Sequence, residues 1–393
     1  MGPLTYSGWI VRRFGYRWSF IVGLTVFGVG TLLFWPSALK HSFGGFCGSA
    51  FVIGSGLATL EASAIPFVAI CGPPQYAEIR LNLSQAFQST ATVSALVLAS
   101  YVILDDNSAD DEHSNSLASV QWMYLGIALF VFLLAFALYF APIPEITDED
   151  LAEQAKEHAG TGYEERPLRK QYKLFFGVFS AFCFTGSMVS VGTFFINYAV
   201  EVKPGLSDQS AAHRLAIAQA VFAAGRFVAS ALMIKFKPAH ILLIANTVVI
   251  TCLAAAIGAK GEAGIAVVTI EFFAKSSIFP TLFTLTLKGL GKNTKRGASW
   301  LVASVASGIV FSPAMGAAAD KLGTQKAFIV PLIGTVLAYA YPIYLNIKEL
   351  GNETDTEGHG DNDLDDSQQR EEAAQIQRGF NEYCEVKSRT EAR

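Results

Sequence analysis

The chain has 393 residues, of which 52% are hydrophobic and only 16% are charged. A soluble domain carries about a quarter charged residues, so this composition excludes an ordinary soluble protein. The net charge is −4, and no basic patch of the kind that binds nucleic acid occurs outside the connectors between apolar runs. We therefore expect the lipid bilayer, and not a nucleic acid, to surround this chain.

The apolar runs predict an all-α, polytopic membrane bundle of ten spans, since roughly 20 apolar residues cross a bilayer as one helix. The predicted spans lie at about 18–39, 45–70, 80–104, 118–141, 171–200, 210–234, 238–258, 263–288, 298–319 and 326–347. Residues 1–11 fit the end of one further helix.

A polar connector at 142–170 divides these spans into a group of four and a group of six. The sequence therefore predicts an N-terminal half at 1–141, a C-terminal half at 171–348 and an acidic tail at 349–393. The tail has no pattern of a packed core, which is typical of a disordered segment or a loose helix.

Lys and Arg are distributed unevenly over alternate connectors, and this predicts the orientation of the chain. With the connector at 12–17 in the cytoplasm, fifteen Lys and Arg lie inside and six outside, which is the positive-inside bias. The inside group is Arg12, Arg13, Arg17, Arg80, Lys156, Arg166, Arg169, Lys170, Lys173, Lys235, Lys237, Lys288, Lys292, Lys295 and Arg296; the outside group is Lys40, Lys203, Arg214, Lys260, Lys321 and Lys326. The central connector and the tail are then cytoplasmic.

The sequence contains none of the common motifs of catalysis or metal binding. It has no GxxxxGK(S/T), GxSxG, HExxH or CxxC segment, and its five cysteines are scattered over apolar spans and the tail. We expect no enzymatic activity, no metal and no cofactor.

Glu61 is the only Asp, Glu, Lys or Arg between Lys40 and Glu78. A carboxylate inside the membrane is costly, so such residues usually face a cavity and take part in function. Shelter from water favours the protonated form, which makes Glu61 a candidate for proton coupling. The alternative is a structural carboxyl that bonds Ser63 or a nearby backbone group.

Asn82, Gln85 and Gln88 follow at intervals of three and so share one broad helix face. Amides offer both donors and acceptors, which suits the hydroxyls of a neutral polyol. Phe87 offers an apolar ring for a sugar but points away from that face. Hydrogen bonding between helices explains the same spacing, and the two interpretations remain open.

Three further charged residues interrupt the spans of the predicted C-terminal half. Glu271 and Lys275 have the favoured i, i+4 order of a self-neutralised pair, with a charged element of a transport path as the alternative. We expect Arg226 to be structural, with backbone groups or an acid as its partner.

Several segments resemble a known family. Residues 8–17 (GWIVRRFGYR) resemble the loop between helices 2 and 3 of the major facilitator superfamily, although Arg12 stands where the common pattern has Asp. A wider set of segments resembles the fucose–proton symporter branch of this superfamily, with its fungal glucose/galactose relatives. These segments are Glu61 to Phe87, Phe195 to Tyr198 with Asn197, Gly225 to Phe227, Phe279 to Thr281, and Lys288 to Ser299.

This resemblance implies twelve helices in two pseudo-symmetric halves and proton-coupled uptake of a hexose (fucose, glucose or galactose class) by alternating access in the plasma membrane. The coupling ion is H+, the family's helix-4 carboxylate falls on Glu61, and its helix-5 amides fall on Gln85 and Gln88. We expect Asn82, Asn197 and Phe279 to complete the sugar site. The gating loop motif comprises Gly8, Arg12, Arg13, Gly15 and Arg17.

The chain departs from the family pattern at three places. The family's first helix has no counterpart, Ile65 stands where Asn is usual, and Met188 stands where Gln is usual. We expect an incomplete form of a longer protein. The alternative is a sugar sensor or inactive relative that does not transport, with the acidic tail as its signalling element.

Overall fold

The computed structural model of the chain describes residues 3–40, 42–104, 114–144 and 168–357, together with positions 149, 151 and 153. Every regular element in these parts is helical. The chain divides into two compact units, Met1–Tyr344 and Leu345–Arg393. Most of the predicted central connector, the loop 105–113 and the tail beyond residue 357 lie outside the described residues.

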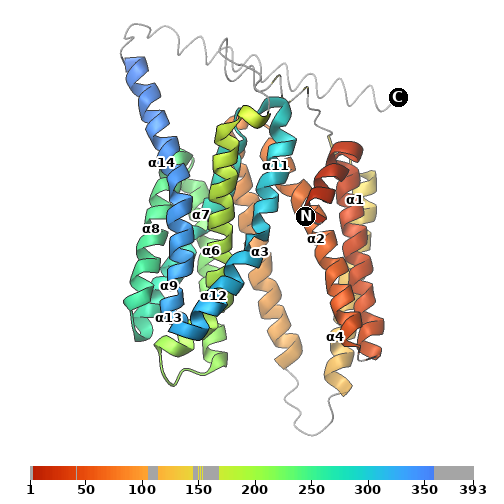
Figure 1. Cartoon of the computed structure of the whole chain (residues 1–393). Helices are drawn as coiled ribbons and strands as arrows, with labels where there is room; N and C mark the ends of the chain where they lie inside the picture. Colours follow the sequence, from red (N-terminus) through yellow and green to blue (C-terminus); the bar gives the residue numbers. More distant parts are fainter. Residues whose placement is uncertain are drawn as a thin grey trace, which may run out of the picture. The chain divides into compact units, whose positions relative to one another are not determined.

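Figure 1 labels most of the helices, which are numbered in chain order. The predicted N-terminal half contains α1 (Pro3–Leu39), α2 (Phe43–Ile70), α3 (Ala77–Leu104) and α4 (Ser114–Phe140). The predicted C-terminal half contains α6 (Tyr172–Val202), α7 (Asp208–Leu232), α8 (Pro238–Gly258), α9 (Gly261–Lys275), α10 (Ile278–Leu287), α11 (Thr294–Ala303), α12 (Gly308–Leu322), α13 (Thr324–Ala327) and α14 (Ile329–Glu357). The 3-10 turns are η1 (Pro74–Tyr76), η3 (Leu168–Lys170), η4 (Gly291–Asn293) and η5 (Ser304–Ser307).

All ten predicted spans are helical, but the last three are broken and not continuous. α9 and α10 are separated at Ser276 and Ser277, η5 interrupts the next span, and α13 ends before α14 begins. Among the described residues, eight segments are long and apolar enough to cross a membrane. α3 is not among these segments, and α4 contributes the shorter apolar stretch Tyr124–Phe140; parts of both helices, including residues 96–104 of α3, lie outside the described side chains.

α1 combines two helices across a break at Gly15, whose φ of 80° and ψ of 179° lie outside the helical region. A positive φ of this kind favours glycine, which lacks a Cβ. The break falls inside the 8–17 motif, so the residues before it end one helix and those after it begin the first predicted span. The structure does not describe the surroundings of Gly8 or the side chains of Arg12 and Arg13.

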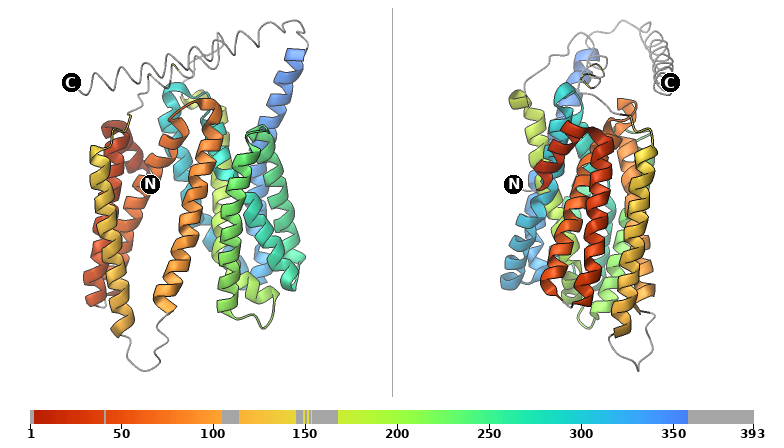
Figure 2. Two further views of the ribbon diagram at one scale, coloured as in Figure 1. Left: turned by 180° about the vertical axis from the view of Figure 1, so that it is seen from behind. Right: turned by 90° about the vertical axis from the view of Figure 1, so that its right-hand side faces the viewer.

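α1, α2 and α4 pack side by side, as Figure 2 also shows. Small residues let α1 and α2 approach closely: the backbone of Gly56 lies against Phe27, and that of Gly23 against Leu60. Close approach through small residues is a common device for helix pairing in membranes. Aromatic contacts extend this packing, with the rings of Phe34 and Tyr124 stacked at 4.8 Å.

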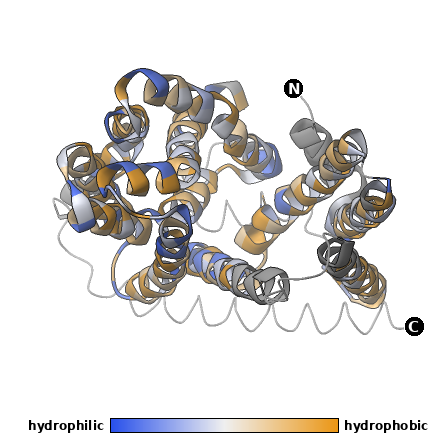
Figure 3. Ribbon diagram, turned by 90° about the horizontal axis from the view of Figure 1, so that it is seen from below, coloured by the Kyte–Doolittle hydropathy of each residue, from blue (hydrophilic) through white to orange (hydrophobic). Residues whose placement is uncertain are grey.

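α3 packs mainly against α7; it contacts α10 and α2 to a similar, smaller extent and α4 least. Hydrophobic residues predominate along most helices in Figure 3, whereas α3 has a more polar surface. Its polar residues therefore lie where the predicted N-terminal and C-terminal halves meet.

The close approach of α1 and α2 predicts a strong effect of Gly56→Ala. A Cβ at this position would lie 2.5 Å from the Phe27 nitrogen and 2.8 Å from its Cα, so the two backbones must separate. Overpacking of this kind costs about 1–3 kcal/mol. We expect a lower thermal unfolding midpoint of the detergent-solubilised protein. Gly54→Ala is the matched control, because nothing lies within 4 Å of its added Cβ; equal midpoints for the two variants would contradict this packing.

Candidate functional site

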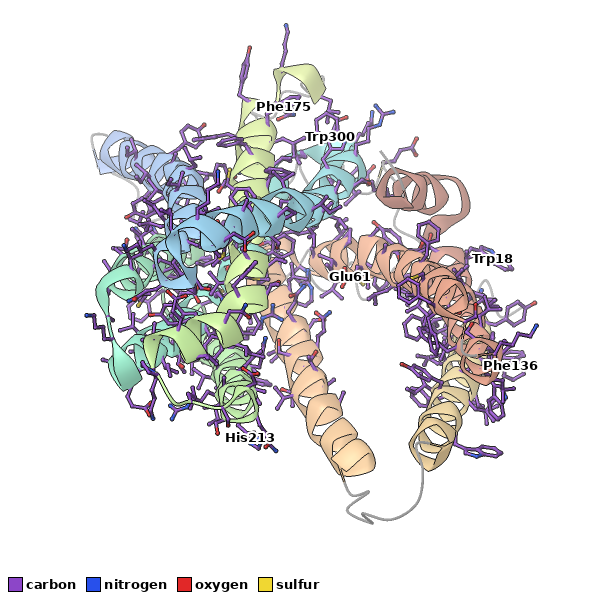
Figure 4. The ribbon with its side chains drawn as sticks, turned by 60° about the horizontal axis from the view of Figure 1, so that its bottom comes forward. Trp18, Glu61, Phe136, Phe175, His213 and Trp300 are labelled. Carbon is purple, nitrogen blue, oxygen red and sulfur yellow. The ribbon has the colours of Figure 1, made fainter. Side chains whose placement is uncertain are left out.

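Glu61 lies on the face of α2 that is turned away from α1. Gly56 and Leu60 form the contact with α1, and Glu61 is about 140° and 100° away from them around the helix. In Figure 4 it is found on the opposite side from the outer residues Trp18 and Phe136. Its half-buried carboxylate has neither a hydrogen bond nor an ion pair with any residue that the structure describes. The hydroxyl of Ser63 instead donates to the Thr59 carbonyl at 2.7 Å.

Asn82 joins the two halves of the chain. Its side-chain nitrogen donates to the Thr281 hydroxyl on α10 at 3.1 Å and to the backbone carbonyl of Glu78 at 2.9 Å. Its side-chain oxygen is buried and has no partner among the described residues. The predicted alternative for this residue, a hydrogen bond between helices, is thus present, and its role in sugar binding stays a prediction.

Gln85 and Gln88 differ in exposure although they share the α3 face with Asn82. The Gln85 side chain is buried, whereas Gln88 and the neighbouring Phe87 are exposed. The ring of Phe87 lies edge-on to Phe227 of α7, with 5.7 Å between centroids. Neither amide forms a side-chain hydrogen bond with a described residue, so both remain available to a ligand.

Arg226 of α7 is 6% exposed and bonds α3 and the α9–α10 break simultaneously. Its Nη1 donates to the Gln85 backbone carbonyl at 2.5 Å and to the Ser89 hydroxyl at 2.7 Å, and its Nε donates to the Ser276 carbonyl at 3.1 Å. The guanidinium lies over the Phe222 ring at 4.6 Å. As expected, its partners include backbone groups; no acid is paired with it in the described part of the chain.

Glu271 and Lys275 form the self-neutralised pair that their spacing predicts. The Lys275 ammonium donates to the Glu271 carboxylate at 2.8 Å, and each side chain is 2% exposed. The ammonium also lies over the Phe272 ring, 3.4 Å from its centroid. The pair stands in the last turns of α9, directly before the break between α9 and α10.

The remaining predicted sugar-site residues come from the C-terminal half. Phe279 is buried in α10, with its ring 6.0 Å from that of Phe283, and Asn197 is exposed near the end of α6. No hydrogen bond among the described residues joins Asn197 or Phe279 to the α3 amides. Their roles in binding stay predictions.

The 8–17 motif and the 288–299 segment, two connectors that contain several glycines, contact each other. Tyr16, directly after Gly15, is buried with its ring 5.3 Å from that of Phe67, and the Lys295 ammonium is 5.9 Å from the Tyr16 ring centroid. Arg17 donates to the Tyr139 carbonyl. The 8–17 motif and the 288–299 segment thus join α1, α2 and α11 at one end of the helices.

A pocket of about 490 Å³ lies between α1, α2 and α4, but its lining is unsuited to a sugar. Phe20, Phe67, Val68 and Leu138 line it, and the thiol of Cys71 is its most polar side chain. A polyol site needs placed donors and acceptors, so this pocket is not the candidate site.

Sequence reasoning missed two partners of the α3 face. Ser89 follows Gln85 by one turn, and Thr281 follows Pro280; both bond across the halves. The i, i+3, i+7 spacing of Asn82, Gln85 and Ser89 was the available signal, because these positions lie on one face of a helix.

Comparisons with known proteins agree on one family. Residues 4–303 match the sequence profile of the Major Facilitator Superfamily. A "Glucose/galactose transporter" of Brucella abortus is 33% identical over 338 residues, which cover 85% of this chain and 79% of that protein. The "L-fucose-proton symporter" of Escherichia coli is 29% identical over 343 residues, covering 83% and 78%.

A crystal structure of the transporter FucP in the outward conformation is also similar. It matches with a TM-score of 0.76 and 27% identity, covering 87% of this chain and 86% of that chain. The relatives from Brucella and Escherichia are bacterial, whereas the sequence resemblance pointed to fungal glucose/galactose transporters.

Replacing Lys275 tests whether Glu271 and Lys275 form a buried ion pair on α9. Lys275→Met leaves Glu271 without a counter-charge, and removal of one partner of a buried pair costs about 3–5 kcal/mol. We expect a marked fall in the thermal unfolding midpoint of the purified protein. The double variant Glu271→Gln with Lys275→Met should recover most of it, since no unpaired charge remains. A single variant as stable as the parent would contradict the pairing.

Proposed function

The chain belongs to the major facilitator superfamily, within it to the fucose–proton symporter and glucose/galactose transporter family, and we propose that it couples hexose uptake to inward proton movement. It is a multi-pass membrane transporter of this superfamily and not an enzyme. The proposed location is the plasma membrane, with the central connector and the tail in the cytoplasm.

The observation that carries the proton coupling is the unpartnered carboxylate of Glu61. It is half-buried on α2, faces away from α1 and has no counter-charge in the described structure. A lone carboxylate inside a membrane protein is most stable when neutral. Protonation therefore lowers the cost of enclosing Glu61 away from water, which is the step that an alternating-access cycle requires.

Support for a sugar comes from the amides of α3. Gln85 and Gln88 have side chains without protein partners, and an amide can both donate to and accept from hydroxyls. Phe279 and Asn197 are proposed to contribute from the C-terminal half once the halves close around the sugar. The names of the relatives support a hexose of the fucose, glucose or galactose class.

The contact between the connectors supports alternating access. Tyr16, Phe67 and Lys295 bring the connectors of both halves together at one end. We propose that this contact forms the cytoplasmic gate and opens when the site turns inward, with the 8–17 motif as its hinge.

Glu61→Gln tests the coupling role. The amide is always neutral, so the variant should bind sugar and exchange it across the membrane but fail to accumulate it against a gradient. The measurement is radiolabelled hexose uptake and counterflow in proteoliposomes with an imposed inward proton gradient.

Glu262→Gln is the matched control, because this exposed carboxylate pairs with Lys203 and Arg214 on the surface. It should accumulate sugar as the parent does. Uphill uptake by Glu61→Gln at the parental level would remove Glu61 from the coupling mechanism.

A further inference from the structure

Arg226 occupies a position created by Pro280. In a continuous helix the nitrogen of residue 280 would donate to the carbonyl of residue 276, but proline has no N–H. The chain breaks at Ser276 and Ser277, and the freed Ser276 carbonyl accepts from Arg226 Nε at 3.1 Å. Membrane helices tolerate a break only where another group satisfies the backbone, so a structural need explains this first bond.

The need to satisfy the Ser276 carbonyl accounts for only one of the N–H groups of the Arg226 guanidinium. It has five N–H donors, of which Nε uses one on Ser276 and Nη1 uses two on Gln85 and Ser89. The two N–H groups of Nη2 have no partner in the described structure. Nη2 is also not among the fully enclosed polar atoms that lack partners, so it retains accessible surface.

Gln85 presents unused groups at the same place. Its backbone carbonyl is held by Arg226 at 2.5 Å, while its side-chain amide has no hydrogen bond with a described residue. The residue is 7% exposed, and its amide atoms are not among the enclosed atoms without partners. One cation from α7 and the side-chain amide of the α3 residue whose backbone carbonyl it binds thus offer free donors and an acceptor.

We propose that Arg226 is a ligand-binding residue of the C-terminal half, with Nη2 donating to hydroxyl oxygens of a hexose whose other hydroxyls bond the Gln85 amide. The two N–H groups of Nη2 lie in the rigid guanidinium plane and diverge from one another, which suits two hydroxyl oxygens that are not adjacent on the sugar ring. The bound sugar would then bridge α3 and α7. This inference rests on the proposed hexose transport and assigns a second contact to the same site.

The test is equilibrium binding to the full chain in detergent, which needs no proton gradient. L-Fucose, D-glucose and D-galactose are titrated by calorimetry, and the tightest ligand is followed by its set of monodeoxy derivatives. Arg226→Met should raise the Kd about ten- to hundredfold, because it removes hydrogen bonds from a charged donor. Arg226→Lys should fall between, and it replaces the Met variant if that variant does not fold.

The monodeoxy sugars distinguish a direct contact between Arg226 and the sugar from a purely structural role of Arg226. The sugar without the hydroxyl that meets Nη2 should bind the parent weakly, yet bind Arg226→Met as well as the complete sugar does. A purely structural role would weaken all sugars by the same factor. Arg80→Met is the matched control, because all three nitrogens of Arg80 bond backbone carbonyls of Val68, Pro73 and Ala69; it should lower stability and leave the Kd pattern unchanged.

Two results would overturn the inference in distinguishable ways. If the parent binds hexose and Arg226→Met binds it within twofold, or shows the same deoxy pattern as the parent, Arg226 only supports the helices and the proposed function stands. If the correctly folded parent binds none of the three hexoses, the proposed function and this contact fail together.

Discussion

The candidate site depends on the hydrogen bonds of Arg226, which join α7 to α3 and to the break between α9 and α10. The bond to the Ser276 carbonyl is the central one. Inside a membrane, a backbone carbonyl that loses its helical donor must find another one, and Pro280 creates this need between α9 and α10. The guanidinium that meets it also holds α3 at Gln85 and Ser89. Its charge has no acidic partner in the described structure, so carbonyls, a hydroxyl and the Phe222 ring stabilise it instead.

This arrangement gives α3 a particular position between the halves. Asn82 bonds Thr281 of α10, and the next residues of the same face bond Arg226 of α7. The helix that carries the candidate sugar amides is therefore fixed to the C-terminal half by polar bonds. α2, which carries Glu61, is held to α1 by close glycine packing. In the proposed function, a sugar bound at α3 and a proton bound at Glu61 of α2 would act on different elements, whose relative movement would couple the two.

Much of the fold follows from the sequence. Runs of apolar residues identified all ten helical spans, and the end of a further helix predicted before the 8–17 motif agrees with the break that the structure has at Gly15. Pro280 and Pro313 can break or bend a helix, but the sequence does not place the breaks at Ser276 and η5, because apolar length does not reveal which backbone bonds a proline removes once the helices pack. The charge pattern predicted an orientation that depends on the membrane and not on contacts within the chain.

The candidate site was only partly visible in the sequence. Glu61 was identifiable because a single acid in an apolar run is unusual, and Glu271 with Lys275 because their spacing fixes a pair. The inter-half bonds of Asn82 could not be distinguished from ligand binding, since an amide serves both purposes equally well. The contacts of Arg226 depend on three helices far apart in sequence, and no local pattern specifies which carbonyls a guanidinium will reach.

The most direct measurement is radiolabelled hexose uptake by the purified 393-residue chain in proteoliposomes, with and without an inward proton gradient. L-Fucose, D-glucose and D-galactose are compared, and a protonophore serves as the control. Proton-coupled transport predicts that one of these sugars accumulates above its external concentration only while the gradient lasts, and that the protonophore releases it. Uptake that merely equilibrates regardless of the gradient, or no uptake of any of the three by correctly inserted protein, would contradict it.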